Sequence, residues 1–245
     1  MDSVTVARSL RGSIGLLAMD WLMAPSTFEA GAEAGMPPGL AGYMLGRFGG
    51  LGDVPADSVV AAAHFWEPDL VRGLVAEGRQ VVTPAHAAAV YASICQAWGE
   101  QHLASFDGNE RLGELCERVV EAASPLGAPS FVAWRSQPWP RTGPGRTFQL
   151  CQTMRELRFG RHCVAVMAAG MSPLEAILSG PAGEWNAEMF GWPPPYPDVG
   201  GLADARAAVE ATTDQLHAVD LEVLGPDERA ELRQLAKAAR AHHSG

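Results

Sequence analysis

The segment from Pro144 to Gly170 constrains the fold of this chain more than any other part of the sequence. Proline is suited to the first position of a helix and glycine to the left-handed residue that ends one, so the segment predicts a single long helix. Most of its residues are apolar or strong helix formers, but charged residues interrupt its middle, from Arg155 to His162. A charged cluster in such a helix marks a candidate site.

Helix-forming residues also dominate the rest of the chain. Ala, Leu, Glu and Arg prevail, whereas runs of the β-branched residues that favour strands are scarce. Thr83-Pro84 and Ser172-Pro173 each place an N-cap residue before a proline at the first helical position, and Glu175 completes a capping box. We therefore expect an all-α protein, a multi-helix bundle.

Apolar periodicity predicts further helices at residues 54–64, 67–77, 85–103, 109–123, 202–221 and 226–243. Three sections lack a regular pattern, at residues 25–38, 124–144 and 191–201, and loops of such length often carry function.

These patterns divide the chain into three parts. Residues 1–190 are expected to form a helical ligand-binding or active-site domain, and the proline-rich residues 191–201 a linker. Residues 202–245 predict a helical hairpin or arm, which either packs on the domain or forms a homodimer.

The charge balance argues against a nucleic-acid partner. The chain has 28 acidic and 18 basic residues, a formal net charge of -10, which repels phosphate.

The apolar run at residues 14–24 is interrupted by Asp20 and is too short to span a membrane, and the chain starts without a basic signal-peptide region. We therefore expect a cytoplasmic protein without membrane contact, in which the four cysteines, which have no CxxC spacing, are reduced thiols.

Motifs of several common enzyme classes are missing from the sequence. The histidines at positions 86, 102, 217, 242 and 243 show neither HxH nor HExxH spacing, so we expect no metal site. No GxGxxG, GxxxxGK[ST] or GxSxG motif is present, which argues against nucleotide-binding and serine-hydrolase functions. We expect no cofactor; a haem held by His162, with nearby arginines at its propionates, is the alternative.

The candidate catalytic residues are Arg155, Arg158 and His162. They lie three and four residues apart, so their side chains stack along one stripe of the helix and can grip an anion. Repulsion from the two arginines lowers the pKa of His162 and favours a neutral imidazole that accepts a proton. The alternative is a structural histidine beside a salt-bridge network in which Glu156 or Glu175 holds the arginines.

The same helix carries an apolar stripe that we expect to face the core, with the charged residues at its margin. This stripe consists of Leu150, Met154, Leu157, Val164 and Met167.

Candidate substrate-binding residues lie earlier in the chain. His64, Phe65 and Trp66 end a short helix and can line a pocket mouth, although aromatic residues are more often core anchors. Arg47, which follows Tyr43, can supply a second guanidinium to an anionic ligand or, alternatively, cap a helix C-terminus.

Three blocks of sequence resemble a mostly actinobacterial family of helical proteins, described as helix-turn-helix or winged-helix proteins and often encoded near natural-product genes. The blocks are Gly42-Tyr43 through Arg47, Leu51-Gly52, Pro55, Phe65, Pro68 and Val71; then Arg155-Glu156, Arg158 and His162; then Gly170 and Glu175-Ala176. In that family the central motif reads Leu-Arg-Glu-(His)-Arg-Gly-Asp-Gly-His, whereas this chain has Phe159, Gly160 and Arg161 where Gly, Asp and Gly are usual.

The resemblance also implies a DNA-binding segment that this sequence replaces. Family members continue after the pair corresponding to Gly191-Trp192 into a winged helix, whereas here a proline-rich bridge follows. We therefore expect the wing to be missing.

Together these features predict a cofactor-independent enzyme of specialised metabolism. His162 would act as general acid and base while Arg155 and Arg158 orient a small anionic substrate for isomerisation, cyclisation or elimination. The alternatives are a non-catalytic metabolite-binding or regulatory protein that has lost its wing, and a module whose terminal helices dock a partner.

Overall fold

In the computed structural model, which describes residues 1–244, the chain is all-α, as the sequence predicts. The described residues form no strand. The α-helices are α1 (Ser3–Arg11), α2 (Ile14–Leu17), α3 (Pro25–Glu33), α4 (Gly39–Phe48), α5 (Ala56–Ala63), α6 (Pro68–Arg79), α7 (Pro84–His102), α8 (Asn109–Ala122), α9 (Pro129–Arg135), α10 (Pro144–Ala168), α11 (Pro173–Leu178), α12 (Gly183–Met189), α13 (Ala203–Asp220) and α14 (Pro226–Ser244). Two short 3-10 helices are η1 (Gly49–Leu51) and η2 (Leu221–Val223).

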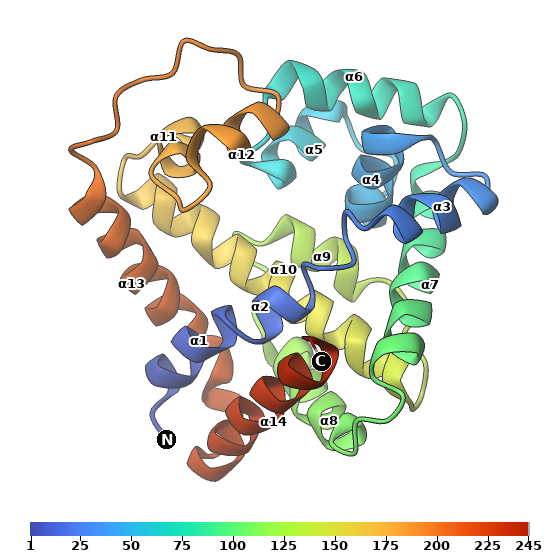
Figure 1. Cartoon of the computed structure of the whole chain (residues 1–245), viewed down its shortest axis with the longest axis vertical. Coiled ribbons are helices and arrows are strands. Elements are labelled where there is room, and N and C mark those ends of the chain that lie inside the picture. Colours follow the sequence, from blue (N-terminus) through green and yellow to red (C-terminus); the bar gives the residue numbers. More distant parts are fainter. Residues whose placement is uncertain (245) are drawn as a thin grey trace.

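Helix α10 is the axis of the bundle. It crosses the middle of the molecule, and α7, α8, α9 and α13 pack around it (Figure 1). Even its polar residues Thr147, Gln149, Gln152 and Thr153 are buried. The helix begins at Pro144 and is followed by a glycine with a φ of 68° at position 170, which confirms the predicted start and stop.

The predicted apolar stripe of α10 is only half right. Leu150, Met154 and Leu157 are buried, but Val164 is 37% and Met167 68% exposed. The reason is that the core changes sides along this helix. Beyond the charged cluster α10 packs against α13, so a different face, including Val166, is buried there.

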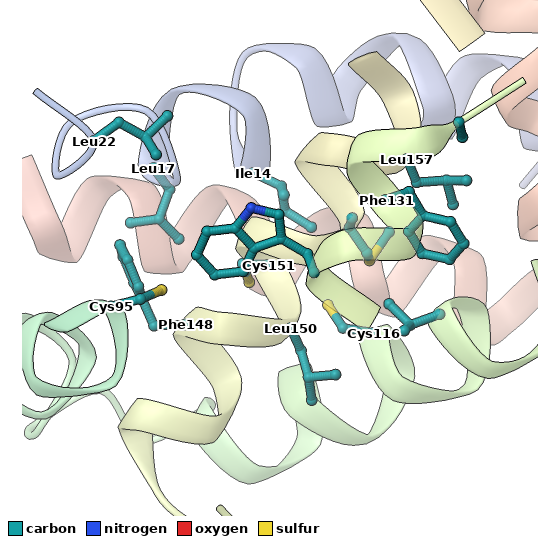
Figure 2. Close-up of a cluster of buried hydrophobic side chains, with 14 of the residues drawn as sticks. Ile14, Leu17, Leu22, Cys95, Cys116, Phe131, Phe148, Leu150, Cys151 and Leu157 are labelled. Carbon is teal, nitrogen blue, oxygen red and sulfur yellow. The ribbon is translucent and has the colours of Figure 1, made fainter. Parts of the chain in front are cut away.

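The principal core joins segments that are distant in sequence. In Figure 2 Ile14 and Leu17 of α2 lie above α10, while Cys116 of α8 faces it from the other side. The four cysteines, at positions 95, 116, 151 and 163, are all free and buried. Burial raises the pKa of the thiols of Cys95 and Cys163, and a hydrogen bond with Cys151, together with burial, raises that of Cys116, so these thiols stay protonated.

Two of the sections expected to be irregular contain helices, which corrects the prediction. Helix α3 lies within residues 25–38 and α9 within residues 124–144, and both begin at a proline. Helices this short draw their stability from burial rather than from local propensity, and Phe131 and Trp134 of α9 are buried in the core. Helices α1, α2, α4 and α12 also lie outside the predicted set.

The C-terminal helices pack on the rest of this chain. Helix α13 lies along α10 and α1, and α14 lies against α8, α1 and α2 (Figure 1). Pairing through these helices in a dimer stays a prediction. The proline-rich residues 191–201 are tied down at one end, because the Trp192 indole donates a hydrogen bond of 2.8 Å to the Phe65 carbonyl.

Candidate functional site

Two cavities flank α10 near the middle of the molecule. The larger has a volume of about 210 Å³ and is walled by α1, α2 and α10; its lining residues are Leu10, Arg11, Ile14, Gly15, Leu16, Met19, Met154, Arg155, Arg158, Phe159, His162 and His217. The smaller has a volume of about 130 Å³ and is lined by Met19, Leu22, Met23, Tyr43, Arg47, Ala63, Phe65, Trp66, Arg155, Phe159, Met189 and Phe190. Met19, Arg155 and Phe159 line both cavities, so they form the boundary between them.

The structure brings seven of the eight candidate residues to these cavities. The larger receives Arg155, Arg158 and His162, and the smaller receives Arg155 again together with Tyr43, Arg47, Phe65 and Trp66. His64 lines neither of the two. It ends α5 with a φ of 50°, its Nε2 atom is buried without a hydrogen-bond partner, and burial lowers its pKa.

A buried ionic network joins α4 to α10 beside the smaller cavity. Arg47 donates to both carboxylate oxygens of Glu156, at 3.0 and 2.9 Å, and also to the Tyr43 hydroxyl at 2.7 Å. The same carboxylate accepts a bond of 2.7 Å from Arg155 and one of 2.8 Å from Gln152. Of the two acids expected to hold the arginines, Glu156 does so for Arg155. Glu175 instead closes the capping box at the start of α11.

The charges in this network do not balance. Two guanidinium groups, with side chains 4% and 18% exposed at Arg47 and Arg155, share the one carboxylate of Glu156, which is fully buried. Although burial opposes its ionisation, the two neighbouring arginines hold the pKa of Glu156 below its usual value. For Arg155 the balance is opposite, because desolvation lowers its pKa more than Glu156 raises it.

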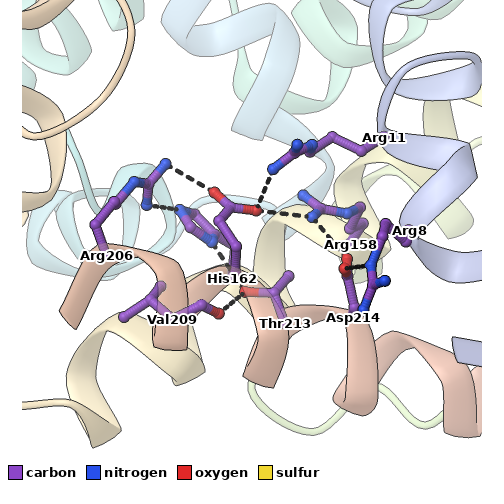
Figure 3. Close-up of polar contacts among 9 residues, drawn as sticks. Arg8, Arg11, Arg158, His162, Arg206, Val209, Thr213 and Asp214 are labelled. Carbon is purple, nitrogen blue, oxygen red and sulfur yellow. Dashed lines mark hydrogen bonds and ion pairs between the residues drawn. The ribbon is translucent and has the colours of Figure 1, made fainter. Parts of the chain in front are cut away.

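His162 lies between α10 and α13, and Figure 3 shows both of its ring nitrogens engaged. Nδ1 is 3.0 Å from the Thr213 hydroxyl, and Nε2 is 3.1 Å from the Arg206 guanidinium. Because the Thr213 hydroxyl donates its own proton to the Val209 carbonyl at 2.8 Å, it can only accept from the histidine. The neutral ring therefore carries its proton on Nδ1, and its Nε2 lone pair accepts from arginine.

The imidazole is held in this neutral form. Burial is the largest cause that lowers the pKa of His162, to about 4; Glu210 opposes the shift, while Arg206 and Arg158 add to it. The expected direction of the shift is therefore present, with burial rather than the arginines as its main origin. A haem iron at His162 would need the lone pair that meets Arg206, so the residues present do not fit that ligand.

A second ionic network surrounds the histidine, and its partners come from α13 and α1. Arg158 donates to Glu210 at 3.1 Å and to Asp214 at 3.2 Å, while Arg8 and Arg11 approach the same two carboxylates from α1 (Figure 3). These partners of Arg158 are not among the residues predicted from the sequence. The signal that indicates them is the spacing of Arg206, Glu210 and Asp214, which places these three charges on one face of α13.

The chemistry available in the cavities follows from these contacts. The imidazole of His162 is neutral and bonded at both nitrogens, and Arg158 has carboxylate partners in Glu210 and Asp214. Arg155 makes a single hydrogen bond within residues 1–244.

No group of three or more acidic, histidine or cysteine side chains in that range is arranged to hold a metal ion. None of the helices described is long and apolar enough to cross a membrane.

Comparison with known proteins identifies one family. No curated protein and no solved structure matches the chain. A helix-turn-helix family matches residues 7–196, which include every helix from α2 to α12 and all the residues that line the smaller cavity. Since the match covers more than half of the sequence, the chain belongs to this helix-turn-helix family.

Proposed function

We propose that this chain is a binding protein for a small, largely apolar molecule that carries one acidic group, and that Arg155 receives that group. The observation that carries this proposal is the unbalanced charge beside the cavities. Arg47 and Arg155 share one buried carboxylate, so one positive charge is left over in a largely buried network in which the Arg155 side chain is 18% exposed. A ligand anion completes the balance.

The position of Arg155 supports its assignment as the ligand contact. Arg47 donates three hydrogen bonds, to Glu156 and Tyr43, whereas Arg155 donates one, to Glu156, and lines both cavities. Charge-assisted hydrogen bonds from a guanidinium are among the stronger polar contacts to a carboxylate. Around this cation the walls are built mainly from aliphatic, aromatic and methionine side chains, which favour an apolar body.

The engaged state of His162 favours binding over catalysis. To act as a general base, Nε2 would first have to lose its contact with Arg206. An acid/base enzyme acting on the same ligand is the second candidate, favoured by the neutral imidazole that lines the larger cavity.

Membership of a helix-turn-helix family supports a ligand-responsive regulator as the origin of the binding site. The loss of the DNA-binding wing is part of this proposal. It is supported by α13 and α14, which follow residue 196 and pack on α1, α8 and α10. The net charge of -10 supports the absence of a nucleic-acid partner, and a mobility-shift assay with genomic DNA fragments tests that part.

Calorimetric titration with two probes of equal chain length, decanoate and decanol, tests the proposal. We expect decanoate to bind more tightly, and Arg155→Gln to weaken decanoate about tenfold or more while leaving decanol unchanged. Arg155→Gln leaves Glu156 paired with Arg47, so the variant keeps a balanced network and should fold. Arg72→Gln, at an exposed residue of α6, is the control with the same change in net charge.

Equal binding of the acid and the alcohol by the native chain would refute the role of Arg155. Catalysis is tested separately by incubating substoichiometric protein with a small-molecule extract and following the masses present. A compound that is consumed by the native chain but not by His162→Ala would favour the enzyme.

A further inference from the structure

We propose that the two cavities are one site, that the smaller cavity holds the acidic group, and that Phe159 controls the passage of an elongated apolar tail into the larger cavity. The ligand class is then an extended, flexible monocarboxylic acid. This inference rests on the proposed function and adds the orientation and shape of the ligand.

The hydroxyl of Tyr43 places the acidic group in the smaller cavity. Its oxygen accepts a hydrogen bond of 2.7 Å from Arg47, and within residues 1–244 its own proton is donated to no acceptor. Tyr43 is only 5% exposed and lines the smaller cavity, so a buried donor is available there. Arg155 lines the same cavity, and a carboxylate between the two satisfies both the free hydroxyl proton and the unbalanced guanidinium.

The larger cavity suits the tail. Its wall from α1 and α2 is formed by Leu10, Ile14, Gly15 and Leu16 together with Arg11, whose guanidinium is paired with Glu210, and Met154 closes it on the side of α10. Arg158, which also lines it, has two carboxylate partners of its own. An apolar chain in this cavity gains free energy with every methylene group that leaves water.

Phe159 and Met19 form the neck between the two cavities. Both line both cavities, Phe159 from α10 and Met19 from the segment after α2. The Phe159 ring is held on two sides: the Arg47 guanidinium lies 4.8 Å from its centre, and the Phe65 ring packs edge to face at 5.7 Å. Met19 is 48% exposed, so only one wall of the neck is fixed by packing.

Titration with straight-chain acids from butyrate to decanoate separates the role of the neck from that of the acidic group. In the native chain we expect affinity to rise roughly fourfold for each added methylene once the tail passes the neck. Phe159→Trp narrows the neck, so the affinity should stop increasing with chain length beyond the short acids, while butyrate binds as tightly as it does to the native chain. Tyr43→Phe instead weakens every acid by about the same factor, roughly fivefold, without changing the rise with length.

Met19→Trp narrows the neck from its exposed side and guards against a folding defect in Phe159→Trp. An unchanged dependence on chain length in both variants, with acids still binding through Arg155, would overturn the neck while leaving the proposed function intact. A native chain that binds no acid of any length refutes both. A Tyr43→Phe variant that binds all acids as the native chain does would overturn the placement of the acidic group.

Discussion

Glu156→Gln is expected to destabilise the protein by about 3–5 kcal/mol, because it removes the only carboxylate from a buried network with two arginines. The carboxylate accepts four hydrogen bonds, two from Arg47 and one each from Arg155 and Gln152. The amide is nearly the same size but has one acceptor oxygen, so its NH2 group must face an arginine donor. The net charge of the network rises from one to two.

Urea unfolding followed by far-UV circular dichroism measures this loss. For a chain of this size it corresponds to a fall of roughly 6–20 °C in melting temperature. Glu231→Gln is the matched control, since it removes an exposed carboxylate that pairs with Arg111 and should change stability little. The double variant Arg155→Gln with Glu156→Gln returns the network to a single positive charge, so it should be more stable than Glu156→Gln alone.

A loss below about 1 kcal/mol for Glu156→Gln would show that water screens the network, as it does for surface pairs. Binding of an anionic ligand to the unbalanced charge would then be refuted too, because it depends on the same shielding from water.

Two further predictions concern helix packing and pH. Gly160→Ala should destabilise the protein by about 1–3 kcal/mol, since its new Cβ would lie 2.5 Å from the Cβ of Ala128. Gly73→Ala, with open space around it, should instead stabilise the protein by about 0.5–1 kcal/mol. Thermal denaturation of both variants tests this, and equal effects on the melting temperature would contradict it. The folded-state pKa of His162 is lowered to about 4 from an ordinary 6.5. The contribution of its neutral imidazole to the free energy of unfolding is therefore fully present above pH 6.5 and is lost as pH falls towards 4. Urea unfolding between those pH values should show His162→Gln losing less stability on acidification than the native chain, by on the order of 2 kcal/mol, and parallel curves would disprove it.

Helix boundaries set by local signals could be read from the sequence. The capping box at Ser172 is present, and the Thr83 side chain accepts from the amide of His86, because caps depend on residues three apart. Helices α1, α2, α3, α4, α9 and α12 were not predicted, since local sequence signals do not show the burial against distant segments that stabilises such short helices. The exposed Met167 shows the same limit, because the sequence does not tell where the core changes sides along α10.

The sequence predicts residues that line the two cavities, but it does not predict which partners those residues contact. Residue type and position in the sequence point to Arg155 and Phe65, and both line a cavity. The partners of His162, Arg206 and Thr213, lie more than forty residues further on. Only the tertiary packing of α13 on α10 brings them together, and it is this packing that occupies Nε2.

The four buried cysteines allow local opening of the structure to be followed by thiol alkylation. Each thiol reacts with an alkylating reagent only when a fluctuation exposes it, and the mass added per modified thiol counts how many have been reached. Cys163 lies on the α10 segment beside His162, whereas Cys95, Cys116 and Cys151 lie in the principal core. Order of modification therefore distinguishes local breathing around the histidine from global unfolding, without introducing any label.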